Sequence, residues 1–278
     1  MTTELFSNAP HSPTKIGYHI GNLCDILFYT PLVKDGNPRN ITIDIVDDEV
    51  AKNKAPLFNG LCPVTISKSP SPPPLVINRD THRSQSYLDL FELSSADRNF
   101  LPKIIVTNEE LEWARNFLKD FNNPIIYIPN NSCSYDKRNL FSQMRTFTKE
   151  MNDVIIRELS RKYTLLQFGL NNKFYSGMRA EIYNYDNVIN IENLNIRQLA
   201  ACYSVIGKGF CSDTGDPYLM LAVGGKIIEI VPMYSIEIYP YYQYIYCDTD
   251  LWKNEKIRAK YFCMKDWKDA LEFTDFNF

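Results

Sequence analysis

The stretch that decides the fold spans residues 205–231 and reads VIGKGFCSDTGDPYLMLAVGGKIIEIV. Its pattern predicts a strand at 204–207, a polar loop, a helix over 216–223 and a second strand over 226–231. Pro217 suits the first turn of the helix, where its missing N–H removes no bond, and Gly224 suits a left-handed residue at the helix end. A strand, a helix and a strand in this order indicate a parallel α/β sheet.

The same alternation extends over both halves of the chain. We expect further strands at 15–20, 40–46, 102–106, 125–128, 164–168 and 188–191, a helical segment that opens at 25, and helices over 86–93, 107–118, 141–163 and 195–203. Asn122-Asn123-Pro124 has the composition of a linker, so we place a domain boundary there. The predicted fold class is α/β, with two Rossmann-like parallel-sheet domains, 1–121 and 122–278, facing across a cleft.

Composition narrows the class of protein. The chain has 278 residues, 45% of them hydrophobic, which is enough for two cores. Its net charge of -3 argues against a protein that holds nucleic acid mainly by neutralising phosphates. The seven cysteines form no C-x-x-C pair, so we expect no disulfide framework and no structural zinc site. Neither a signal peptide nor a transmembrane run is visible, and we expect a cytoplasmic protein.

The loop before the predicted helix, 212–217, has the chemistry of an anion-binding site. Ser212, Asp213 or Thr214 can cap the first turn, and the free N–H groups of that turn can bind phosphate oxygens. Gly215 would let the backbone approach a ligand closely. The same residues also suit an ordinary capped helix, so local mechanics leave both interpretations open.

Three segments resemble the heptosyltransferase family, glycosyltransferase family 9. The first, DTGDPYLMLAVG at 213–224, resembles the family's D-[ST]-G-x-x-H-L-A-A-A-x-G. The second, GNLCDILFYTP at 21–31, is similar to G-D-x-[LI]-x-x-[TL]-P. The third, NLNIRQLAA at 193–201, looks like the family's L-x-[EQ]-L-A-A-L helix. The segments occur in the family's order, and the resemblance covers about residues 15–235.

The resemblance implies a GT-B fold and an inverting glycosyl transfer that needs neither metal nor cofactor. The donor would be a nucleotide-diphosphate sugar of the ADP-heptose kind, and the acceptor a hydroxyl in surface glycan or lipopolysaccharide synthesis. Asp25 matches the family's proposed base. The positions implied on the donor side are Asp213, Thr214, Gly215, Asp216 and Tyr218, with Lys137 favoured over Arg138 as the cation, and Asn130 and Ser132 in the same loop. The positions expected on the acceptor side are Asn22 and His19.

Two positions depart from the family pattern. Cys24 stands where the family has glycine, and Tyr218 stands where it has histidine. These departures keep open the alternative of a non-catalytic binding protein that kept the fold. A second alternative is a phage-type glycosyltransferase that acts on modified DNA bases. We also expect the C-terminal segment, with its aromatic run at 239–246, to pack back on the first domain.

Overall fold

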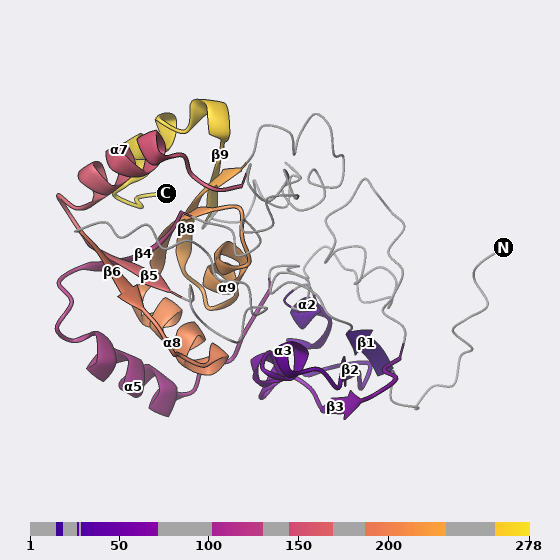
Figure 1. The fold of residues 1–278 in the computed structure, drawn as a ribbon. Helices are drawn as coiled ribbons and strands as arrows, with labels where there is room; N and C mark the ends of the chain where they lie inside the picture. The colour runs from indigo at the N-terminus through magenta and orange to yellow at the C-terminus, as the bar shows by residue number, and fades with distance from the viewer. Residues whose placement is uncertain are drawn as a thin grey trace.

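Two separate parallel sheets organise the chain (Figure 1). The computed structural model describes residues 15–18, 27, 29–71, 102–129, 145–168, 187–231 and 259–278. In these ranges the first sheet has the order β1-β2-β3, formed by Lys15–Tyr18, Thr42–Val46 and Val64–Ser67. Three short helical segments accompany it: α2 (Thr30–Val33), α3 (Glu49–Lys52) and the 3-10 helix η1 (Ala55–Phe58).

The second sheet has the order β6-β5-β4-β7-β8-β9, with every neighbouring pair parallel. Its strands are β4 (Pro124–Ile128), β5 (Thr164–Phe168), β6 (Val188–Ile191), β7 (Lys208–Ser212), β8 (Lys226–Val231) and β9 (Ala259–Cys263). Its helices are α5 (Asn108–Leu118), α7 (Lys149–Leu159), α8 (Ile196–Ile206) and α9 (Asp216–Ala222). The predicted fold class, α/β with two Rossmann-like parallel sheets, is confirmed.

Alternate residues of the second sheet enter two different cores, as expected when helices cover both faces of a parallel sheet. Ile126 and Ile128 of β4 join a cluster that also contains buried side chains of α8, α9 and the first sheet. Ile125 and Tyr127 of the same strand join a second cluster, which α7 and the C-terminal residues complete. Figure 1 shows α7 and the chain's yellow C-terminal end on the side of the sheet away from α8.

An extended segment, 102–107, ties the two sheets together. The Lys103 amide donates to Thr30 Oγ1 at 2.9 Å, and the Ile104 amide donates to the Ala222 carbonyl at 2.9 Å. We expected a strand at 102–106, but within the described part of the chain this segment belongs to neither sheet. The amides of this segment form hydrogen bonds to the two halves of the chain instead of joining a β-sheet.

Two other predicted elements are corrected. The strand expected at 204–207 is wrong, because α8 continues to Ile206 and ends at Gly207 with φ 68°, and the strand follows at Lys208–Ser212. The helix expected over 141–163 is shorter, since α7 begins at Lys149 behind its N-cap Thr148. The helix expected at 86–93 lies outside the described residues. The strands β3 and β9 were not predicted.

The C-terminal residues 259–278 contact the second sheet and its helix layer. Strand β9 pairs with β8, the 3-10 helices η3 (Met264–Asp266) and η4 (Asp269–Phe273) follow, and the Tyr163 hydroxyl donates to the Thr274 carbonyl at 2.7 Å. The expected return of the C-terminal segment to the first domain stays a prediction, and the aromatic run at 239–246 lies outside the described ranges. The domain boundary between 121 and 122 stays a prediction.

Across the described ranges, every helix is too short or too polar to be a membrane-spanning candidate.

Candidate functional site

The strand order of the second sheet marks one position as a ligand site. Chain order runs outward from β4 through β5 to β6, then returns to the centre and runs outward again through β7, β8 and β9. The direction of winding thus reverses between β4 and β7. In open parallel sheets a ligand binds outside the carboxyl ends of the strands at this reversal, where neighbouring loops leave in opposite directions.

An ion pair joins the two sides of this switch point. Arg145 follows β4, whose last residue is Ile128, and Asp213 is the residue directly after β7. Arg145 Nε donates to Asp213 Oδ2 at 2.8 Å. The two side chains are only 16% and 3% exposed, so water screens the pair weakly. The pair places a guanidinium, the group best suited to bidentate phosphate contacts, at the predicted ligand position.

The loop after β7 is held from within by its own polar groups. The Asp216 amide donates to Thr214 Oγ1 at 3.2 Å, so Thr214 binds an N–H of the first turn of α9 as expected. The Thr214 hydroxyl in turn donates to Asp216 Oδ2 at 3.1 Å. Gly215 is the N-cap residue and Pro217 lies in the first turn, which confirms the predicted start of the helix.

Asp216 is reached from a second element as well. The Tyr203 hydroxyl, near the end of α8, donates to Asp216 Oδ1 at 2.6 Å. Burial raises the pKa of Asp216 above its ordinary value of 3.8, and the hydroxyls of Tyr203 and Thr214 offset this only in part. The loop between β7 and α9 is therefore fixed to α8 through a partly buried carboxyl group.

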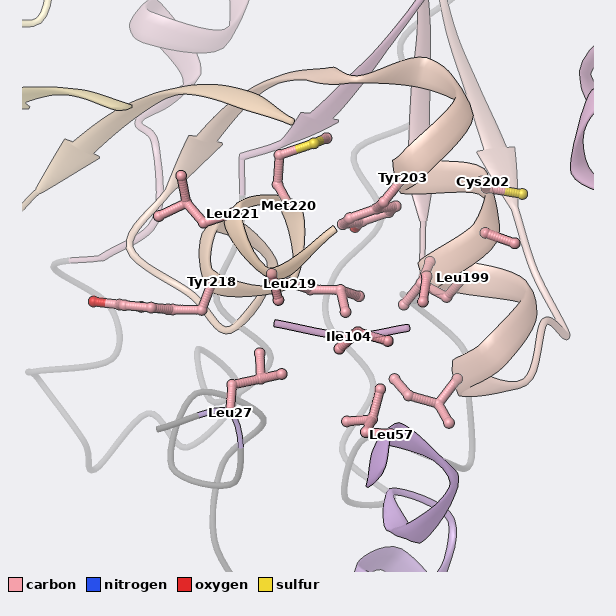
Figure 2. Close-up of a cluster of buried hydrophobic side chains, with 14 of the residues drawn as sticks. Leu27, Leu57, Ile104, Leu199, Cys202, Tyr203, Tyr218, Leu219, Met220 and Leu221 are labelled. Carbon is pink, nitrogen blue, oxygen red and sulfur yellow. The ribbon is translucent and has the colours of Figure 1, made fainter. Parts of the chain in front are cut away.

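Tyr218, which stands where the resemblance expects histidine, is packed into the core. Its side chain is 3% exposed and belongs to the cluster that also holds Leu27 and Leu219. Figure 2 shows Leu27, Leu57 and Ile104 facing the side chains of α8 and α9 within this cluster. The expected contact of Tyr218 with a donor diphosphate stays a prediction.

The structure brings together four of the predicted donor-side positions, Asp213, Thr214, Gly215 and Asp216, in one loop at the switch point. The other predicted site residues lie outside the described ranges: Asp25, Asn22, His19, Lys137, Asn130 and Ser132.

Sequence reasoning missed Arg145 and Tyr203. Arg145 was hidden inside the helix expected over 141–163. The Thr148 N-cap could have revealed it, because a threonine three residues before Met151 marks a helix start and leaves 145–147 in the preceding loop. Tyr203 lay at the end of the helix expected over 195–203, but no local signal connected its hydroxyl to Asp216, 13 residues away.

Two parallel sheets of this kind, with a switch-point site on the second, define a GT-B fold. Solved structures with this fold include a family 9 glycosyl transferase from Veillonella parvula DSM 2008. It aligns with a TM-score of 0.59 and 11% identity, over 95% of this chain and 89% of that one. The E. coli ADP-heptose lipopolysaccharide heptosyltransferase II aligns with a TM-score of 0.52 and 9% identity, over 95% and 97% of the two chains.

A third similar structure is the dodecameric iron-containing heptosyltransferase TibC, solved in complex with ADP-D-beta-D-heptose. Its TM-score is 0.51 and its identity 12%, over 79% of this chain and 58% of that chain. At such identities the likeness is one of fold. No protein-family model matches the sequence, and no curated protein sequence matches it.

Proposed function

We propose that this protein is a glycosyltransferase that moves a sugar from a nucleotide-diphosphate donor to an acceptor hydroxyl. One observation carries the proposal: the Arg145–Asp213 pair lies at the switch point of the second sheet in a GT-B fold. A guanidinium at this position suits a leaving group that carries two phosphates. The heptosyltransferase structures of the same fold favour a donor of the ADP-heptose kind.

The reaction we propose is an inverting displacement without a metal ion or cofactor. The acceptor oxygen attacks the anomeric carbon, the bond from that carbon to the donor phosphate oxygen breaks, and a nucleoside diphosphate leaves. Asp25 would take the proton of the acceptor hydroxyl. Arg145 and the backbone N–H groups near Thr214 and Gly215 would stabilise the charge that develops on the diphosphate.

Each part of the loop has a separate task in this scheme. Asp213 fixes the orientation of Arg145 through the 2.8 Å bond to Nε, which uses one of the five N–H donors of a guanidinium. Thr214 and Gly215 supply backbone groups at the start of α9. Lys137, Asn130 and Ser132 would approach the diphosphate from the loop after β4, and Asn22 and His19 would contact the acceptor. A surface glycan or a lipopolysaccharide precursor is the acceptor class we propose.

The test is binding of nucleotide sugars to the purified protein. Thermal shift against ADP-, UDP-, GDP- and CDP-sugars should single out one donor. At about 100 times its Kd, that donor adds about 2.7 kcal/mol to the stability of the folded state and raises Tm by several degrees. Arg145→Ala should then weaken donor binding by about 10- to 100-fold, because a charge-assisted contact to phosphate is lost.

A matched control separates this loss from a general loss of positive charge. Arg161 also follows a strand–helix unit of the second sheet, but it is 65% exposed and pairs only at the surface with Glu158. Arg161→Ala should leave donor binding unchanged. Asp25→Asn should abolish transfer and leave donor binding in place, because the base acts on the acceptor. A protein that binds none of the four donors contradicts the proposal.

A further inference from the structure

Asp216 is a partly buried carboxyl group that the proposed chemistry does not use directly. It stands at the first position of α9, where the loop from β7 turns into the helix. It has contacts on both oxygens: the Tyr203 hydroxyl at 2.6 Å on Oδ1 and the Thr214 hydroxyl at 3.1 Å on Oδ2. Taking a carboxyl group partly out of water costs free energy, and these hydrogen bonds offset that cost.

A buried thiol lies near Asp216. Burial raises the pKa of Cys211 on β7, and the carboxyl groups of Asp216 and Glu229 add to this effect. The hydrogen bonds from Tyr203 and Thr214 favour the charged form of Asp216 itself. Asp213, which forms the ion pair with Arg145, belongs to the same loop.

The contacts of Asp216 determine the conformation of Thr214. The Thr214 hydroxyl accepts a hydrogen bond from the Asp216 amide and donates one to the Asp216 carboxyl group. Together these two bonds fix the orientation of the hydroxyl group. Asp213, one residue earlier, is then presented to Arg145. Removing the Tyr203 hydroxyl would leave Asp216 Oδ1 without that donor, and the carboxyl group would be free to turn away from its present orientation.

We propose that Tyr203 and Asp216 are positioning residues of the donor site: the Tyr203 hydroxyl, acting through Asp216, holds Thr214 and Gly215 in the conformation that receives the diphosphate. This inference rests on the proposed function. Neither residue needs to touch the donor. The hydrogen bonds among Tyr203, Asp216 and Thr214 keep the loop pre-organised before binding, which reduces the ordering that the donor would otherwise have to induce.

Tyr163 provides a control away from the carboxyl ends of the strands. It directly precedes β5, at the amino end of that strand, and its hydroxyl donates to the Thr274 carbonyl at 2.7 Å. It packs against the cluster beneath α7, whereas Tyr203 belongs to the cluster with α8 and α9. Tyr163→Phe and Tyr203→Phe therefore delete the same group, and of these two hydroxyls only that of Tyr203 binds Asp216.

The experiment measures the Kd of ADP, UDP, GDP, CDP and inorganic pyrophosphate by calorimetry well below Tm, together with amide hydrogen exchange at 214–217. Tyr203→Phe and Asp216→Ala should raise the Kd of the bound probes about five- to tenfold and speed exchange in the loop. Tyr163→Phe should lower Tm and leave both readouts unchanged. Asp216→Asn keeps an acceptor for Tyr203 and offers an N–H to Thr214 Oγ1, so its Kd should lie between those of the wild type and Asp216→Ala.

The outcomes separate the two proposals. If the wild type binds a probe and Tyr203→Phe binds it equally well with unchanged exchange, the positioning role is overturned and the proposed function stands. If the wild type binds none of the five probes, the proposed function is overturned and the positioning role falls with it. If Tyr203→Phe does not fold, Asp216→Asn and Asp216→Ala still decide: equal Kd values for these two and the wild type overturn the role.

Discussion

Asp44 is a buried aspartate and Asp216 a partly buried one, and their pKa values shift in opposite directions. Burial alone would raise the pKa of Asp44, but hydrogen bonds from Thr65, Ser71 and Ser67 lower it below 3.8. Their distances are 2.7 Å, 2.8 Å and 3.0 Å. For Asp216 the loss of solvation dominates over the hydrogen bonds from Tyr203, Thr214 and a backbone amide, and its pKa lies above 3.8. The balance between lost solvation and hydrogen bonds to the charged form therefore decides the direction of each shift.

The pH dependence of stability should reveal the state of Asp216. Because its native pKa is raised, the folded protein holds a proton that the unfolded chain releases. The stability from this group is fully present below 3.8 and is lost as pH rises through the native pKa. Asp216→Asn removes that loss. The free energy of unfolding in urea, measured from pH 3.5 to 7, should therefore shift in favour of Asp216→Asn over the wild type as pH rises.

Asp44→Asn should behave in the opposite way. A lowered native pKa stabilises the folded state above the unfolded value and loses that effect as pH falls through the native value. The Asp44→Asn variant should thus lose stability relative to the wild type as pH rises toward neutrality.

One outcome would contradict the prediction for Asp216. If the difference in free energy of unfolding between Asp216→Asn and the wild type stays constant over this pH range, Asp216 does not hold a proton more tightly when folded.

At the scale of elements, the helix α8 begins at a capping box. Asn195 Oδ1 accepts hydrogen bonds from the amides of Arg197 and Gln198, both at 2.9 Å. In turn, Gln198 Oε1 accepts a hydrogen bond from the Asn195 amide at 3.0 Å. Asn195→Ala should lower the free energy of unfolding by about 1 kcal/mol, within a range of about 0.5–2 kcal/mol. Chemical denaturation measures the loss.

Asn195→Asp is the control for this cap, because aspartate keeps the acceptor and adds a negative charge at the helix N-terminus. Its stability should equal or exceed that of the wild type. Equal losses for Asn195→Ala and Asn195→Asp would show that the side-chain oxygen does not stabilise α8.

The elements that sequence reasoning predicted well are those where two independent signals coincide. The strands at Thr164–Phe168, Val188–Ile191 and Lys226–Val231 were predicted at their observed bounds, each a short apolar run bounded by polar or turn residues. The helix expected over 107–118 is also confirmed: α5 begins directly after Thr107, which forms a capping box with Glu110. At 204–207 only an apolar run was available, and such a run suits the end of a buried helix as well as a strand.

The candidate site could likewise be predicted only in part from the sequence. The loop 213–216 could be predicted, because a strand, a polar loop and a proline-started helix follow one another in the sequence. The partners of this loop could not, since Arg145 and Tyr203 reach it through the fold: Arg145 lies 68 residues from Asp213 and belongs to a different strand–helix unit. Pairing over such distances leaves no local pattern.

At the scale of the whole molecule, Arg197 connects both halves of the chain. From the first turn of α8 its guanidinium donates to both Glu110 oxygens on α5, at 2.7 Å and 2.5 Å. It also donates to the Ile105 carbonyl of the connecting segment at 2.6 Å and to the Pro56 carbonyl of η1 at 3.5 Å. Glu110 in turn accepts from the Thr107 amide in the α5 capping box. One side chain thus fixes the segment 102–107 between the two sheets.

Arg197→Ala should therefore destabilise the protein and loosen the connection between its halves. The Arg197 and Glu110 side chains are 11% and 27% exposed, so the loss should reach about 2–3 kcal/mol, above the value of about 1 kcal/mol or less for surface pairs. Lysine cannot reproduce the fork of contacts, and Arg197→Lys should recover only part of the loss. Urea unfolding gives the stability, and hydrogen exchange at Lys103 and Ile104 reports on the connection. The amides of Lys103 and Ile104 form hydrogen bonds to the two halves only while the segment 102–107 keeps its position. If Arg197→Ala loses stability but exchange at these amides is unchanged, Arg197 stabilises the contact between α5 and α8 and does not hold the connecting segment.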